Sequence, residues 1–144
     1  MAYLTLDIIT QEKPTFSGTV EAITAPASEG EVTILPKHIP LFTKLAPGEV
    51  KILQKDRWTN LAVAGGFMDV APGSQVTILA DSAVRIEEIN VAKAEEAKQK
   101  AEARLKEQKL SKREFALATA DLRRAVLELH VARKYRRRSQ LPGE

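Results

Sequence analysis

The stretch that decides the fold is Gln75–Glu107, QVTILADSAVRIEEINVAKAEEAKQKAEARLKE. It begins in the last of several short, strand-like runs and passes, near residue 86, into an Ala-rich, charged, helical pattern. Six of the seven glycines and six of the seven prolines lie at or before Gly73, and the next residue of either kind is Pro142. The sequence therefore predicts a compact β part followed by a helical part that can scarcely form a core of its own.

Short strands account for the first part. Leu4, Leu6 and Ile8 alternate with polar residues, which is the period-2 signature of a half-buried strand. Further strands are expected at Thr19–Thr24, Val32–Leu35, Glu49–Gln54, Thr59–Ala64, Phe67–Val70 and Gln75–Leu79. Turn residues separate them and no helix intervenes, which favours an antiparallel β-sandwich or barrel. The pair Gly65-Gly66 indicates a bulge or a close backbone approach, because no phosphate-loop motif follows it.

The second part predicts two antiparallel helices. The first is expected at about Glu87–Glu107, capped by Asp81 or Ser82. Ser111 and Glu114 fit a capping box that opens the second helix. The expected seam joins Ala94, Ala97, Ala101 and Leu105 to Phe115, Ala118, Leu122, Ala125, Leu129 and Ala132. Each buried methyl contributes only about 0.8 kcal/mol, so this hairpin should detach or extend easily.

The predicted fold class is thus α+β, with an N-terminal antiparallel β-sandwich and a C-terminal two-helix antiparallel hairpin. We expect a docking domain at residues 1–86, a regulatory hairpin at residues 87–138 and a frayed tail at residues 139–144.

Composition restricts the class of protein. The chain has no cysteine, so disulfides and thiolate metal sites are excluded. The N-terminus lacks a secretory signal, and no run approaches the roughly 20 apolar residues of a membrane span, so direct membrane insertion is not expected. The two histidines, His38 and His130, lie in different parts of the chain, and no catalytic constellation or metal site suggests itself.

The net charge of +3 is unevenly distributed. Residues 1–86 carry a net charge of −2 and residues 87–144 a net charge of +5, with most of the excess in the run Arg133–Arg138. A basic end steers toward an acidic partner. Nucleic-acid binding is one alternative, but aromatic residues are sparse and the basic residues cluster on one terminal helix, so we predict no nucleic-acid partner.

Three motifs resemble one family. The segment SEGEVTILPKHIPL at residues 28–41 resembles a signature of the epsilon subunit of F-type ATP synthase, bacterial type. GGFMDV at residues 65–70 and TILADSA at residues 77–83 resemble that family in the same order and spacing. The resemblance implies a non-catalytic central-stalk subunit of a proton- or sodium-translocating ATP synthase. Its sandwich would bind the γ subunit and the c-ring, and its movable hairpin would restrain ATP hydrolysis.

The resemblance also assigns residues. Glu29, Glu31 and His38 would face the c-ring and the foot of γ. Five cations would contact the β subunit, and the α subunit is a further expected partner. These cations are Arg123, Arg124, Arg133, Lys134 and Arg136. Several such pairs together would form a salt-sensitive latch, although single exposed pairs contribute little. The implied location is the cytoplasmic face of the bacterial plasma membrane, and the alternative is the stromal side of the chloroplast thylakoid.

One family feature departs from the pattern. Some bacterial members bind ATP on the hairpin through an I/L-D-x-x-R-A motif, and this chain has Ile89, Asn90, Lys93 and Ala94 at those places. Asn removes a charge and Lys removes the planar fork of Arg. Arg124 matches a basic position of that site, but Glu128 stands where a second Arg is expected. We therefore predict weak or absent ATP binding and no cofactor.

Overall fold

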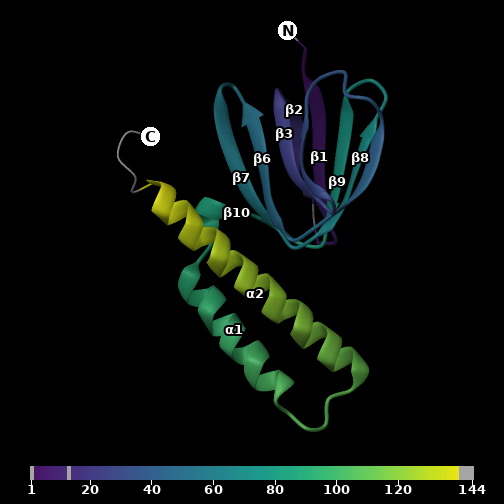
Figure 1. Cartoon of the computed structure of the whole chain (residues 1–144). Coiled ribbons are helices and arrows are strands. Elements are labelled where there is room, and N and C mark those ends of the chain that lie inside the picture. Colours follow the sequence, from purple (N-terminus) through teal and green to yellow (C-terminus); the bar gives the residue numbers. More distant parts are fainter. Residues whose placement is uncertain (1, 13, 140–144) are drawn as a thin grey trace. The chain divides into compact units, whose positions relative to one another are not determined.

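The computed structural model describes residues 2–12 and 14–139, with side chains as far as Arg136. The chain forms two compact units that divide between Arg85 and Ile86 (Figure 1). The first unit consists of strands and the second of helices, which confirms the predicted α+β class. The expected tail at residues 139–144 falls almost wholly outside the described residues, and Ser139 itself is the last residue of the second long helix.

The strands of the first unit are β1 (Leu4–Thr10), β2 (Pro14–Val20), β3 (Ala22–Ala27), β4 (Gly30–Ile34), β5 (Leu41–Leu45), β6 (Gly48–Gln54), β7 (Arg57–Val63), β8 (Gly66–Ala71), β9 (Gln75–Ala80) and β10 (Ala83–Arg85). They are hydrogen-bonded in the order β10-β7-β6-β3-β5-β8-β9-β1-β2, and β4 pairs with β3. β2 returns to β6, where the Glu21 N–H donates to the Leu53 carbonyl oxygen at 2.8 Å. The long sheet thereby folds onto itself as a sandwich (Figure 1).

The pairing is antiparallel between all described strands except β1 and β9, which are parallel. A parallel pair needs a long connection, and the segment between β1 and β9 spans most of the unit. The sequence pattern could not reveal this one exception, because parallel and antiparallel strands share the same side-chain period.

The hydrophobic core lies inside the sandwich. On β1, Leu4, Leu6 and Ile8 have no exposed surface, as their alternation predicts. The inward positions of the other strands complete the core with residues that include Val20, Ile23, Ile34, Leu45, Val50, Ile52, Leu61, Val63, Met68, Val70, Val76 and Ile78. Each large aliphatic side chain contributes about 1.5–3 kcal/mol when fully buried, so this core is the main source of hydrophobic stabilisation in the unit.

Most predicted strands are confirmed, but three regions differ. The single strand expected at Thr19–Thr24 is wrong, since β2 ends at Val20 and β3 begins at Ala22. Two further strands were not predicted, β5 (Leu41–Leu45) and β10 (Ala83–Arg85). Because β10 pairs with β7, the chain around Ser82 belongs to the sheet and does not begin a helix.

The second unit contains the short 3-10 helix η1 (Ile86–Glu88), α1 (Val91–Leu105) and α2 (Lys112–Ser139). The predicted caps Asp81 and Ser82 are wrong: the cap of α1 is Asn90, whose Oδ1 accepts a hydrogen bond from the Lys93 N–H at 3.1 Å. The start of α2 is confirmed, since the Ser111 Oγ accepts from the Glu114 N–H at 3.1 Å. Each cap stabilises its helix by about 1 kcal/mol.

The hairpin seam is narrower than predicted. Buried alanines of α1 and α2 meet across it, with Leu129 as the largest predicted residue that is fully covered. Ala97 and Phe115 were expected in the seam, but both are exposed. Burial that the pattern did not predict comes from Val131 on α2 and from Ile86 in η1, which packs against α2.

Candidate functional site

The candidates for function are, on the sandwich, the predicted loop residues and a row of exposed apolar side chains, and, on the hairpin, a groove between the helices and the basic face of α2.

No helix within residues 2–12 and 14–139 is long and apolar enough to cross a membrane. Within the same ranges, no group of three or more His, Cys, Asp or Glu residues is placed to hold a metal ion.

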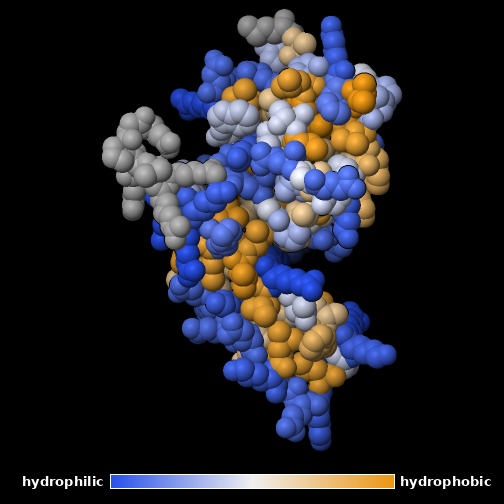
Figure 2. All heavy atoms as spheres, viewed as in Figure 1, coloured by the Kyte–Doolittle hydropathy of each residue, from blue (hydrophilic) through white to orange (hydrophobic). Residues whose placement is uncertain are grey.

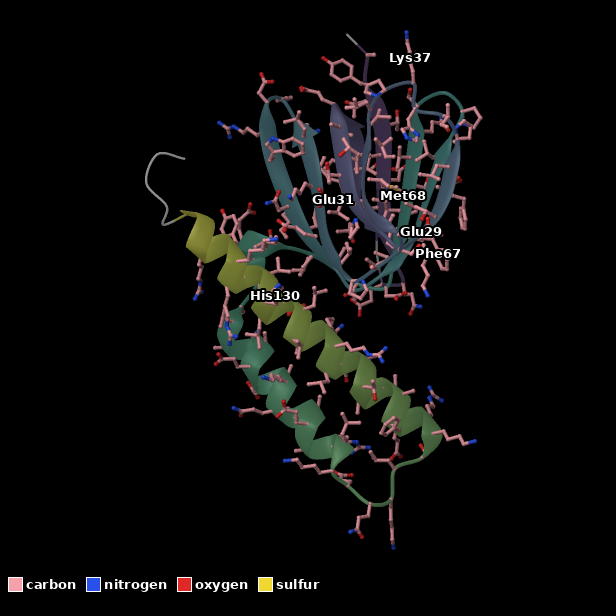
Figure 3. The ribbon with its side chains drawn as sticks, viewed as in Figure 1. Glu29, Glu31, Lys37, Phe67, Met68 and His130 are labelled. Carbon is pink, nitrogen blue, oxygen red and sulfur yellow. The ribbon has the colours of Figure 1, made fainter. Side chains whose placement is uncertain are left out.

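The predicted loop residues of the sandwich do not form one site. Glu29 lies in the turn between β3 and β4, whereas His38 lies in the loop after β4. The five residues of β4 separate them, a rise of about 17 Å. Figure 3 shows Glu29 near one end of the sandwich and Lys37, the neighbour of His38, at the other. Glu31 belongs to β4, opposite Pro26, close to the Glu29 end.

Local hydrogen bonds fix the His38 loop. The Lys37 backbone takes a positive φ of 69°, and its N–H donates to the Ser74 Oγ at 2.9 Å. The His38 N–H donates to the Leu35 carbonyl oxygen at 3.1 Å, and its Nδ1 lies 2.6 Å from the Ile39 carbonyl oxygen. These contacts hold the loop against the turn between β8 and β9, and the His38 ring stays half-exposed.

An apolar row crosses the outer face of the sandwich and was missed by sequence reasoning. We call Ile9, Phe42, Phe67 and Leu79, which are 38%, 68%, 44% and 52% exposed, the outer apolar row. Phe67 on β8 pairs with Leu79 on β9, and Leu79 pairs with Ile9 on β1. The rings of Phe42 and Phe67 stack with their centroids 5.7 Å apart. A cluster of this kind marks an interaction surface more often than single exposed apolar residues do.

Gly66 makes this arrangement possible. It has a φ of 143°, and a Cβ atom there would collide with the Leu79 carbonyl oxygen. Only glycine lets the start of β8 come this close to β9, which confirms the predicted close approach. In the turn between β3 and β4, the Ser28 N–H donates to the carbonyl oxygen of Lys44, and Lys44 on β5 is the strand partner of Phe67. This turn, which holds Glu29, therefore lies at the same end of the sandwich as Phe67, whereas the loop that holds His38 lies toward the other end (Figure 3).

The hairpin has an open groove between its helices. A hollow of about 340 Å³ is lined by Ala97 and Ala101 of α1 and by Leu117 and Ala118 of α2, with charged side chains around it. Leu117 is 56% exposed at its edge. Figure 2 shows apolar surface running along the hairpin. The groove lies toward the loop end, away from η1.

The degenerate ATP-motif positions do not converge on this groove. Asn90 uses its side chain as the cap of α1, Ala94 is buried, and Ile89 is half-buried with its N–H bonded to the Ile86 carbonyl oxygen. Neither Asn90 nor Lys93 lines the groove, whereas Arg124 does and lies 3.7 Å from the Asp121 carboxylate.

Glu128 is half-buried one turn further along α2. Burial raises the pKa of its carboxyl group, and the nearby Arg124 guanidinium lowers that pKa by a smaller amount. The prediction of weak or absent ATP binding stays a prediction.

The predicted basic residues of α2 are all exposed but differ in their partners. Arg124 pairs with Asp121, and Arg133 lies 4.0 Å from Glu95 on α1. Within the described side chains, Arg123 and Lys134 have no ion-pair partner. They are eleven residues apart, which is about three helical turns, so they lie on one face of α2.

That face is the strongest candidate for an acidic partner. His130 lies between the two cations at helical spacing and is exposed (Figure 3). Cations without an internal partner give up no existing ion pair when they bind an external carboxylate, so Arg123 and Lys134 are better placed for this than Arg124 and Arg133.

Comparisons with known proteins cover nearly the whole chain. Residues 3–86 match the family described as ATP synthase, Delta/Epsilon chain, beta-sandwich domain, and residues 87–133 match its long alpha-helix domain. The chain is 45% identical over 141 residues to the ATP synthase epsilon chain of Dehalococcoides mccartyi, which covers 98% of this chain and 100% of that relative. It is 42% identical over 139 residues to the ATP synthase epsilon chain 2 of Ralstonia nicotianae, which covers 96% and 99% respectively.

Two solved structures are also similar. A chain in the Euglena gracilis mitochondrial ATP synthase, solved as OSCP, F1 and c-ring, matches with a TM-score of 0.67 and 26% identity, over 93% of this chain and 82% of that chain. A chain in the central stalk and c-ring of the Tetrahymena thermophila mitochondrial ATP synthase matches with a TM-score of 0.54 and 18% identity, over 90% and 96%, a likeness of fold alone.

Proposed function

Because the chain belongs to the ATP synthase delta/epsilon family, as an epsilon chain and a non-catalytic component of the central stalk of F1, we propose that its sandwich couples the γ subunit to the c-ring and its hairpin restrains ATP hydrolysis. The observation that carries the proposal is the contrast between the two units. The sandwich has a large buried core and an exposed apolar row, whereas the hairpin is held by a seam in which most of the buried residues are alanines. The first suits permanent docking and the second suits movement.

The outer apolar row is the proposed dock for γ. Its four side chains form a contiguous surface across β5, β8, β9 and β1, which a complementary apolar surface of γ would cover. Glu29 and Glu31 stand at the end of the sandwich where this row lies, and we propose that they face the c-ring. His38, at the opposite end, would then meet another part of γ.

The hairpin is the proposed brake. Its contact with the β subunit would be made by the basic side of α2, with Arg123 and Lys134 as the first residues to bind an acidic segment. Arg124, Arg133 and Arg136 would add to this field as the partner approaches. Each exposed pair contributes about 0–1 kcal/mol, so several must act together and salt should weaken them. We propose that, in a bacterium, the protein acts at the cytoplasmic face of the plasma membrane and is peripheral to it.

Single cysteines test the assignment of partners, because the chain has none of its own. Phe42→Cys should crosslink to γ, Glu29→Cys to the c-ring and Lys134→Cys to the β subunit in the assembled enzyme. Trp58→Cys on β7 is an exposed control outside the outer apolar row. Crosslinking of Phe42→Cys to the c-ring or to no subunit would refute the proposed dock.

ATP binding is tested separately. The side chain of Asn90 is occupied as a helix cap, and Glu128 places a carboxyl group near Arg124. Equilibrium dialysis with the full chain should therefore detect no binding of ATP at submillimolar concentration. Saturable binding in that range would contradict this part of the account.

A further inference from the structure

The two halves of the hairpin are packed differently. We call the half next to η1 the base. There, Ile86, Leu129 and Val131 are 3%, 4% and 4% exposed, and three buried alanines lie among them. In the half next to the loop at residues 106–111, only Ala101 and Ala118 are buried among the described residues. Burial energy scales with apolar area, so the base carries most of the hydrophobic stabilisation of the hairpin.

The loop half is also hollow. The groove of about 340 Å³ lies there, above Ala97, Ala101 and Ala118. The methyl groups of these alanines are too short to fill the groove, which is open to water, so little apolar area is removed from water there. Leu117, which could have filled the groove, leaves 56% of its surface exposed at the edge.

The contact that ties the helices together at the loop end is a weak one. Arg104 on α1 lies 3.5 Å from the Glu114 carboxylate on α2, and the two side chains are 50% and 45% exposed. Exposed ion pairs of this kind add little stability, because water and salt screen them. Among the described residues of the loop half, the fully buried side chains are thus two methyl groups, with half-buried Leu105 and one solvated ion pair beside them.

We infer that the hairpin opens from its loop end. The last turns of α1 and the loop leave α2 first, while Ile86, Leu129 and Val131 keep the base packed. Only the biological role of this opening rests on the proposed function, in which it would be the first step by which the inhibitory hairpin extends. The order of opening is a property of the chain itself and can be measured without any partner.

Native-state hydrogen exchange of the full-length free chain tests this order. Amides of residues 99–105 and 115–121 should exchange about tenfold faster than amides of residues 125–132 in the middle of α2. Ala97→Leu places a longer side chain in the groove and should slow exchange in the loop half by about fivefold, with little change at the base. Ala103→Leu is the matched control, an exposed alanine of the same helix that does not line the groove.

Each outcome decides. Faster exchange at the loop half that Ala97→Leu slows and Ala103→Leu does not supports the inference. Uniform protection along the hairpin overturns it. Unequal exchange that Ala97→Leu leaves unchanged also overturns it, because simple fraying of the ends of α1 and α2 would then explain the data. None of these outcomes depends on whether the hairpin inhibits the ATPase, so the proposed function stands or falls separately.

Discussion

Replacing Phe67 should weaken the attachment of the sandwich to γ. Phe67 is 44% exposed in the free chain, and its ring stacks on Phe42. A phenylalanine side chain offers about 200 Å² of surface, so covering the exposed part removes about 90 Å² from water. At about 25 cal/mol per Å², Phe67→Ala should cost about 2 kcal/mol of binding free energy, or roughly 30-fold in Kd.

The assay is a titration of the full-length variant against an α3β3γ core, followed by calorimetry or fluorescence. Trp58→Ala is the matched control, since Trp58 is 53% exposed on β7 and lies outside the outer apolar row. It should change the Kd by no more than about twofold. Thermal melts of both variants must match the parent chain, so that a loss of binding is not a loss of folding.

A Phe67→Ala variant that binds within about twofold of the parent would refute the reasoning. So would an equal loss for Trp58→Ala, because the binding surface would then not be the outer apolar row. A loss for both Phe67→Ala and Phe42→Ala, with Trp58→Ala unaffected, is the pattern expected for a single stacked contact.

Three further predictions follow from the geometry. Gly66→Ala should lower the melting temperature of the sandwich by about 10 °C or more, because φ is 143° there and the new Cβ meets backbone, whereas Gly18→Ala should melt close to the parent in the same scan. Arg123→Gln should reduce inhibition of ATP hydrolysis and its salt sensitivity more than Arg124→Gln does, since Arg124, unlike Arg123, has an internal ion-pair partner; equal effects would contradict the assignment. Burial raises the pKa of the Glu128 carboxyl group above its unfolded value, so the folded hairpin is favoured while this group is protonated and loses stability as the pH rises through the folded pKa. In thermal melts followed by helicity near pH 4 and near pH 7, the parent chain should show this loss of stability and Glu128→Gln should not.

The sequence pattern predicts the elements better than it predicts the surfaces. The structure confirms strands such as Glu49–Gln54 and Gln75–Leu79. They could be predicted because their residues alternate and turn residues mark both of their ends. The break at Glu21 was missed because Thr19–Thr24 contains no glycine or proline to mark it. The first helix begins later than predicted because Asn90 is the cap, and the residues before it are taken up by β10 and η1.

The candidate sites show what a one-dimensional pattern cannot give. The outer apolar row joins Ile9 to Phe42, Phe67 and Leu79 across four strands, so it exists only once the strand order and register are known. The outward alternation of Phe67 and Leu79 on their own strands was the available signal. Likewise, Glu29 and His38 are close in sequence, but β4 carries them to opposite ends of the sandwich. Their expected contacts with the c-ring and the foot of γ stay a prediction.

The most direct test of the account is the rate of ATP hydrolysis by an α3β3γ core with the full-length chain and with a chain that ends at Arg85, the last residue of the sandwich unit. If the sandwich is the dock and the hairpin is the brake, both proteins bind the core and only the full-length chain suppresses hydrolysis. Equal suppression by the truncated chain, or binding of both without any suppression, would contradict that division of labour.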